Sequence, residues 1–374
     1  MPFGSEPREH GIALALSGGG FRAALFHIGV LWRLNEMGAL KQLARISSVS
    51  GGSITAGLLA VRWDRLIFGS DDVATNFQHE VVAPLRSFCS LNIDVSSIFT
   101  GVLNPFHTAG EEVADELRKH LAMGVSLQTL PDTPRFVFNS TNFATGTGFR
   151  FSKPYAGDYR IGLIPNPDFD VATAVTCSSA FPPVLSPFVI DIADPDIFTQ
   201  TIGADLWDQV DYRRRLQLAD GGVYDNLALE TVWGRYDTVL VSDAGKPFEL
   251  DASISSFVPN QILRVMDIGL NQALALRKRM LMHEYKSHSV KGAFWAINTP
   301  IQNYKTPQVI CVSDQKIQAL SALRTRLDRF NEQEQCELIN WGYAVSDAAI
   351  RAYAPQVATV TTAATLPFAG YPLN

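Results

Sequence analysis

Two glycine-rich turns, each lying between an apolar run and a helix-like pattern, constrain the fold of this chain more than any other feature. The first apolar run covers residues 11–16 and ends in Ser-Gly-Gly-Gly, after which apolar residues recur at helical spacing from Phe21 to Leu34. The second unit repeats this order, with a strand over 44–49, a turn over 50–53 and an apolar helix over 54–63. Two successive strand–turn–helix units predict an α/β fold with a parallel sheet.

The remaining pattern predicts a single domain over residues 1–374, because no internal repeat or linker interrupts it. We expect a core over about 11–245, an insertion over about 64–130 that covers the site, and a C-terminal helical extension over about 250–374. Further helices are expected near 111–123, 171–181, 261–285 and 317–352, and further strands over 136–143, 147–151 and 237–242.

Composition excludes several classes of protein. A hydrophobic content of 47% supports a sizeable core, and a net charge of −6 argues against a nucleic-acid partner. The four cysteines lack zinc-site or disulfide-framework spacing, which indicates a reducing compartment. Neither a signal peptide nor a transmembrane segment is expected, so the prediction is a cytoplasmic protein with at most peripheral membrane contact.

The second turn supplies a candidate nucleophile. Ser50 lies in SSVSGGS, with Ser48 two residues before it and Gly52 two residues after it. Small neighbours allow a serine to occupy a strained strand-to-helix turn with its hydroxyl clear of the sheet. A simple helix N-cap is the alternative, but the flanking strand and helix and the preceding glycine-rich turn favour a nucleophile. Ser53 is a weaker candidate because it lies past the turn.

The first turn supplies candidate oxyanion donors. Gly18, Gly19 and Gly20 can bring consecutive N–H groups close to a ligand oxygen, and the positive end of the following helix dipole lies beside them. Arg22 could hold this loop by bonding carbonyls or could bind a substrate phosphate. A nucleotide site is disfavoured because SGGGFRAA lacks both the GK[ST] ending and the GxGxxG spacing.

A serine nucleophile needs a base, and the strongest candidate is Asp220 in DGGVYDN. An aspartate with an ordinary pKa of about 3.9 is a weak base, so this choice requires a partly desolvated site. His283 and His288 are the only histidines that follow it, and both lie in a basic stretch typical of a solvated helix end. Asp225 is expected to be a helix N-cap, and Asp243 is a weaker rival.

These stretches, together with SSAFPPVLSPF from Ser178, resemble the patatin-like phospholipase family over roughly residues 11–245, with a likeness to its cytosolic phospholipase A2 branch. The resemblance implies a three-layer α/β/α fold and a lipid acyl hydrolase. In this scheme Ser50 attacks an ester carbonyl to form an acyl-enzyme, Asp220 takes the serine proton, and Gly18 to Gly20 hold the oxyanion. It implies no metal and no cofactor.

The leading hypothesis from the sequence is therefore a hydrolase of the phospholipase A or lysophospholipase type, with a lipid substrate docked by apolar residues between Phe88 and Phe106. That apolar stretch could equally be ordinary core. Two alternatives for the function stay open: a carboxylesterase or acyltransferase acting on small esters, and a lipid-binding protein that keeps the fold without catalysis.

Overall fold

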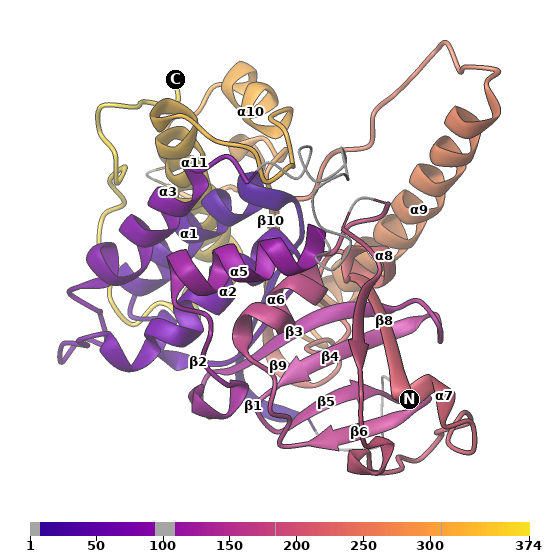
Figure 1. The fold of residues 1–374 in the computed structure, drawn as a ribbon. Coiled ribbons are helices and arrows are strands. Elements are labelled where there is room, and N and C mark those ends of the chain that lie inside the picture. The colour runs from indigo at the N-terminus through magenta and orange to yellow at the C-terminus, as the bar shows by residue number, and fades with distance from the viewer. Residues whose placement is uncertain (1–7, 94–108, 184, 308) are drawn as a thin grey trace.

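The computed structural model describes residues 8–93, 109–183, 185–307 and 309–374, and it is built around one ten-stranded sheet (Figure 1). Eight strands follow one another across the sheet, and two more pair at its side. The order is β10 (Lys291–Ala296), β9 (Tyr236–Asp243), β1 (Glu9–Leu16), β2 (Leu43–Ser48), β3 (Arg135–Asn142), β4 (Thr147–Ser152), β5 (Tyr155–Asp158) and β6 (Gly162–Pro165); β8 (Arg215–Asp220) pairs with β3 and with β7 (Phe188–Asp191).

The sheet is mixed. The strands from β10 to β3 pair in parallel, as the two strand–turn–helix units predict, whereas β4 to β6 extend it in the antiparallel sense. Helices cover both faces, which confirms the expected α/β/α arrangement. The alternation along β1 shows this directly, because Leu14 and Leu16 belong to one buried cluster while Ala13 and Ala15 belong to another.

The pairing of β3 brings two strand ends together. Along β3, Phe138 pairs with Ser48 at the end of β2, and Ser140 pairs with Asp220 at the end of β8. Since β2 runs parallel to β3 and β8 runs antiparallel to it, the carboxyl ends of β2 and β8 point toward each other beside the same strand. Of the residues predicted to act in catalysis, Ser50 lies in the turn that follows β2, and Asp220 is the last residue of β8.

The larger buried cluster lies between the sheet and a layer of helices. These are α1 (Gly20–Glu36), α2 (Gly51–Arg62), α3 (Ala83–Cys89), α5 (Ala109–Leu121), α6 (Val171–Ser179) and α11 (Glu332–Tyr353). α1 and α11 cross at very short range, because a Cβ atom on Gly29 would lie 2.0 Å from the Ile339 carbonyl oxygen and one on Gly342 would lie 1.9 Å from that of Phe26. Glycine at both positions permits this contact.

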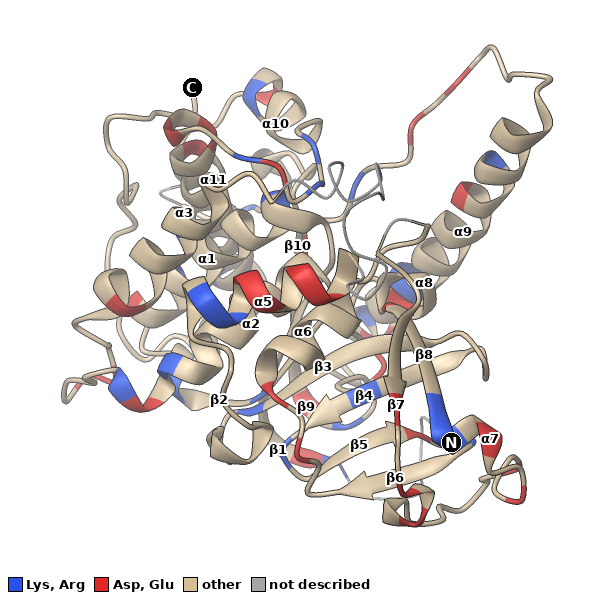
Figure 2. Ribbon diagram, viewed as in Figure 1, with Lys and Arg blue, Asp and Glu red and all other residues tan. Residues whose placement is uncertain are grey.

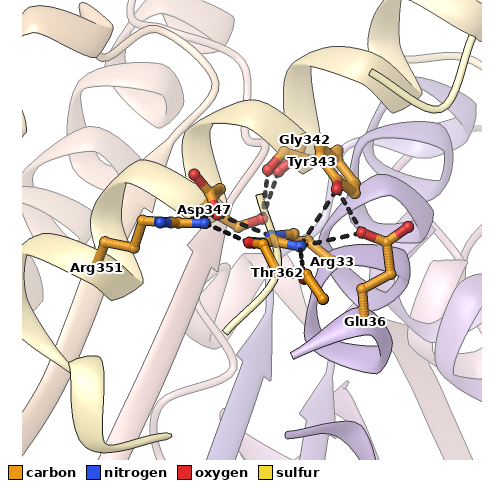
Figure 3. A network of polar contacts seen from close by, with 8 residues as sticks. Arg33, Glu36, Gly342, Tyr343, Asp347, Arg351 and Thr362 are labelled. Atoms are coloured by element: carbon orange, nitrogen blue, oxygen red, sulfur yellow. Dashed lines mark hydrogen bonds and ion pairs between the residues drawn. The ribbon is translucent and has the colours of Figure 1, made fainter. Parts of the chain in front are cut away.

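A buried polar network fastens the same two helices (Figure 3). The guanidinium of Arg33 on α1 is fully buried and donates to Asp347 of α11 at 2.8 Å, to Glu36 at 3.0 Å and to the carbonyl oxygen of Thr362 at 2.9 Å. Arg351 of α11 also donates to Asp347, at 2.8 Å. Charge-assisted bonds of this kind fix α1, whose first turn carries the triglycine loop.

The helical pattern over 317–352 proves to be two helices, α10 (Asp314–Ser321) and α11. A reciprocal capping box between Asn331 and Glu334 starts α11 afresh. The connecting segment crosses the beginning of α1, where the N–H of Phe21 donates to the carbonyl oxygen of Arg326 at 3.5 Å. The interruption therefore places C-terminal residues against the triglycine loop.

The other face of the sheet is covered by α8 (Gly222–Asp225), residues 227–233 and the C-terminal part of α9 (Val258–Lys286). Leu281 of α9 is fully buried there, while the N-terminal half of α9 stands away from the body (Figure 1). No helix in the described ranges combines the length and the hydropathy needed to cross a membrane.

The expected insertion over 64–130 contains α3 and α5. Phe88 and Ile93 are buried in the larger cluster, so this end of the predicted lipid-docking stretch is core. Residues 94–108, with Phe99 and Phe106, lie outside the described residues.

Candidate active site

Ser50 occupies a strained turn between β2 and α2. Its backbone angles, φ 52° and ψ −125°, are rarely adopted by residues other than glycine. Its hydroxyl makes no capping bond to α2, so the N-cap alternative does not account for this serine. The side chain is half-buried, as a nucleophile that must meet a substrate requires.

Ser53 lies in a different environment. It is fully buried in α2, where its hydroxyl donates to Ser48 at 2.9 Å and shares a hydrogen bond with Ser178 at 2.8 Å. Its polar capacity is therefore used inside the protein, and it has no access to a substrate.

The Asp220 carboxylate, at the end of β8, lies near enough to the Ser50 hydroxyl for that group to lower its pKa. One of its oxygens accepts the N–H of Gly222 at 2.7 Å. The side chain is only 2% exposed. Burial raises the pKa of Asp220 to about 6, although the Gly222 N–H and the Ser50 hydroxyl act in the opposite direction. The carboxylate is thus ionised at neutral pH and more basic than an ordinary aspartate.

One backbone carbonyl joins the two turns. The oxygen of Ser178, at the end of α6, accepts the N–H of Ser50 at 3.1 Å and the N–H of Gly221 at 3.2 Å. The Ser178 hydroxyl also accepts from the Ser50 N–H at 3.1 Å and donates to the carbonyl of Asn139 at 2.6 Å. Sequence reasoning noted SSAFPPVLSPF only as a motif, and its position just before two prolines was the available signal for this bracing role.

The triglycine loop is in backbone contact with the start of α2. Gly19 has a φ of 140°, which glycine adopts far more readily than other residues, and a Cβ atom on Gly20 would lie 1.6 Å from the carbonyl oxygen of Thr325. A Cβ atom on Gly51 would lie 2.0 Å from the carbonyl oxygen of Gly20. The Gly18 N–H donates to the carbonyl of Asn226 at 3.2 Å, so Gly18 drops out of the predicted oxyanion donors. Within the described chain, the N–H groups of Gly19 and Gly20 have no backbone acceptor.

Arg22 holds the triglycine loop in place through bonds to three backbone carbonyls. It is fully buried, and its guanidinium donates to the carbonyl oxygens of Ser321 at 2.6 Å, Leu323 at 2.8 Å and Ala244 at 3.0 Å. Burial lowers the pKa of Arg22 to about 10, which still leaves the group charged at neutral pH. Of the two roles considered from the sequence, the geometry supports loop bracing, because both terminal nitrogens of the guanidinium already donate to backbone carbonyls.

The histidines considered as bases lie elsewhere. His283 and His288 are exposed, and His283 lines a shallow surface pocket with Trp233, Arg279 and Met280. His27 on α1 is fully buried between the Ser17 carbonyl and the Ser242 hydroxyl, each at 2.9 Å, and burial lowers its pKa to about 4. It is therefore neutral and holds the loop that precedes α1.

The two other carboxylates considered as bases, Asp225 and Asp243, already accept hydrogen bonds from the backbone. Asp225 accepts the N–H of Leu227 at 3.1 Å and that of Glu230 at 2.9 Å, so it caps the segment that follows it. Asp243 accepts the N–H of Gly245 at 2.9 Å. Each also pairs with a cation of α9, and both are therefore structural groups rather than bases.

Asn226 is a residue of the site that sequence reasoning missed. Its backbone carbonyl accepts the N–H of Gly18. Its side-chain oxygen lies close to two glycines: a Cβ atom on Gly18 would be 2.5 Å from this oxygen, and one on Gly222 would be 2.6 Å from it. The amide thus lies between the triglycine loop and the Asp220 turn. Its place in DGGVYDN, six residues after Asp220, was the available signal.

No metal site accompanies these groups: in the parts of the chain that the structure describes, no three His, Cys, Asp or Glu side chains gather in a way that could hold an ion.

Comparison with known proteins now assigns the family. The model of the patatin-like phospholipase family matches residues 14–233, more than half of the sequence, and this range includes both turns and Asp220. The chain belongs to the patatin-like phospholipase family. A search of curated proteins gave no match.

Among solved structures, the chain is similar to human GIVD cytosolic phospholipase A2, with 13% identity and a TM-score of 0.47 over 90% of this chain and 61% of that one. It thus spans less than two thirds of that protein. VipD from Legionella pneumophila matches with 14% identity and a TM-score of 0.37 over 92% of this chain and 67% of that one.

Proposed function

We propose that this protein is a serine lipid acyl hydrolase of the phospholipase A or lysophospholipase type. Family membership supports the lipid class of substrate. The observation that carries the proposal is the strained turn that holds Ser50 near the buried Asp220 carboxylate, whose pKa burial raises to about 6. A base whose pKa lies near the working pH transfers protons most effectively.

The first half of the reaction forms an acyl-enzyme. The Ser50 oxygen attacks the ester carbonyl while Asp220 takes the hydroxyl proton, and the oxyanion accepts hydrogen bonds from Gly19 and Gly20. Each such donor is worth about 3 to 4 kcal/mol of transition-state stabilisation. The ester bond then breaks, and the leaving alcohol receives the proton from Asp220.

The second half consumes water. A water molecule attacks the acyl carbon while Asp220 takes one of its protons, and the carboxylic acid leaves as the Ser50 oxygen recovers a proton. The half-buried position of Ser50 allows water to reach the acyl group. The step balances with water as the only co-reactant, so the described residues supply all of the acid–base chemistry.

A fluorophosphonate ester, which labels activated serines, tests the assignment. Wild-type protein should be labelled, and Ser50→Ala and Asp220→Asn should lose the label, whereas His283→Ala and His288→Ala should keep it. Labelling that survives Ser50→Ala, or that disappears in either histidine variant, would refute the dyad. Turnover of phospholipid dispersed in micelles, against a short soluble ester, then distinguishes a lipid hydrolase from an esterase of small substrates.

A further inference from the structure

The most exposed apolar segment of the described chain lies on the arm formed by α9 and the loop before it. Leu250, Ile254, Phe257, Val258, Ile262 and Leu263 are between 52 and 92% exposed. We call residues 252–263 the α9 tip. It projects away from the rest of the molecule, next to no other described element (Figure 1). Exposing this much apolar surface is costly in water, so the tip requires an occupant.

The distribution of apolar residues around the helix indicates which occupant. Ile262, Leu263, Val265, Met266 and Ile268 are all at least 46% exposed. At 100° per residue they spread over about 220° of the helix circumference, and Asn260, Arg264 and Asp267 fill the remaining sector. A protein groove or a second copy of the helix would cover a narrower stripe, whereas a lipid surface accepts a broad apolar face with a polar stripe left toward water.

The charged residues that bound the tip indicate how far it could enter a lipid layer. Residues 252–263 contain no Asp, Glu, Lys or Arg, and the first charged residue of the helix is Arg264. Figure 2 shows this stretch in tan, between the acidic residues of the preceding loop and the blue turn. From Val258 to Leu263 the helix rises about 8 Å, which fits the 5 to 10 Å reached by interfacial helices.

The charges below the tip complement an anionic lipid surface. Arg264 would lie at the headgroup level, where its guanidinium donates to the Glu249 carbonyl at 2.8 Å and stacks on Phe248. Arg279 and Lys286 are exposed farther along the helix. Asp267 lies about one turn beyond Arg264, outside the apolar stretch, and stays in water. Basic residues placed behind an apolar end are attracted by anionic headgroups.

The base of α9 is bonded to the candidate active site. Arg277 pairs with Asp225 at 3.4 Å, and Lys278 pairs with Asp243 at 2.5 Å. Asp225 precedes Asn226, and Asp243 precedes Ala244, whose carbonyl oxygen accepts from Arg22. The helix therefore connects the exposed tip to two turns that support the triglycine loop.

We propose that the α9 tip inserts into the surface of an anionic phospholipid bilayer and thereby presents the active site to lipid. The proposed insertion is argued only from the exposure and charge of α9 and the loop before it. The catalytic purpose of the insertion depends on the proposed function.

The test uses full-length Ser50→Ala protein, which cannot consume the lipid, sedimented with vesicles of phosphatidylcholine and phosphatidylglycerol. Adding Phe257→Ser and Leu263→Gln together should lower the bound fraction at least tenfold, because both side chains lose favourable transfer into lipid. The matched control is Ile202→Ser, which removes a fully exposed isoleucine outside the arm and should bind as the parent does. Vesicles of phosphatidylcholine alone should bind more weakly than the anionic ones.

Parent protein that stays in the supernatant, or tip variants that bind as well as the parent, would overturn the insertion. Sedimentation velocity without lipid provides a further outcome: dimers that the tip substitutions dissociate, with no vesicle binding, would identify a second copy as the occupant instead. Labelling by the fluorophosphonate ester in the absence of lipid separates the two proposals. Tip variants with Ser50 intact should be labelled as fast as wild type; if wild type is not labelled, the proposed function fails, while vesicle binding by Ser50→Ala still decides the insertion.

Discussion

Replacing the Asp220 carboxyl group by an amide should change both activity and the pH dependence of stability. The amide oxygen of Asp220→Asn can still accept the Gly222 N–H, so the turn should keep its geometry. The variant cannot take the Ser50 proton, and we expect its turnover to fall by at least about 10²-fold. Wild-type activity should rise with pH through about 6, as the carboxyl group ionises.

The magnitude for stability follows from the pKa. Folding raises the Asp220 pKa from 3.8 to about 6, so the native state binds the proton more tightly than the unfolded chain does. This stabilisation is complete below pH 3.8 and is lost as pH rises through about 6. A difference of about two in pKa corresponds to about 3 kcal/mol. The free energy of unfolding of Asp220→Asn, relative to wild type, should therefore increase by about 3 kcal/mol between pH 4 and pH 8.

Urea unfolding of both proteins at several pH values measures this difference. Parallel stability profiles for wild type and Asp220→Asn would refute the reasoning, because they would mean that the carboxyl group is not desolvated by folding.

Three further predictions concern the backbone around the site. Ser50→Gly should abolish fluorophosphonate labelling yet raise the free energy of unfolding by about 1 kcal/mol, since glycine tolerates a φ of 52°; a less stable variant would contradict the strain. Gly51→Ala should lower the free energy of unfolding by at least about 2 kcal/mol, because its Cβ would lie 2.0 Å from the Gly20 carbonyl oxygen. Its control is Gly269→Ala, whose Cβ would meet no atom within 4 Å and which should stabilise α9 by about 0.5 to 1 kcal/mol. Thermal unfolding of the two variants measures this contrast. Arg22→Met should reduce turnover of a phospholipid and of a phosphate-free ester equally, since Arg22 bonds carbonyls; a loss confined to the phospholipid would show that it binds phosphate instead.

The local elements of the site could be predicted from the sequence. Each strand–turn–helix unit lies within a short stretch, and its apolar spacing and glycines specify the turn directly. The structure confirms both units, with α1 starting at Gly20 and α2 at Gly51. The catalytic roles of Ser50 and Asp220 stay predictions, now supported by the nearness of their side chains.

The groups that brace the site could not be predicted, because their partners are distant in sequence. Arg22 bonds carbonyls near residue 321, and a carbonyl at Ser178 serves two turns at once. Every residue type has a backbone carbonyl, so the sequence does not show which carbonyl will accept a hydrogen bond. The antiparallel half of the sheet was also missed in part, since β5 and β6 are four-residue strands, YAGD and GLIP, too short to show a period.

The meeting of β2 and β8 beside β3 has a consequence for when this protein could first act. On the proposed mechanism, a nascent chain that ends before β8 possesses its nucleophile but lacks the base, and Arg22 still awaits its acceptors near residue 321. Lipolytic competence would then emerge only once the residues near 321 have been synthesised and folded, so that shorter products made in the cell would be harmless to its membranes.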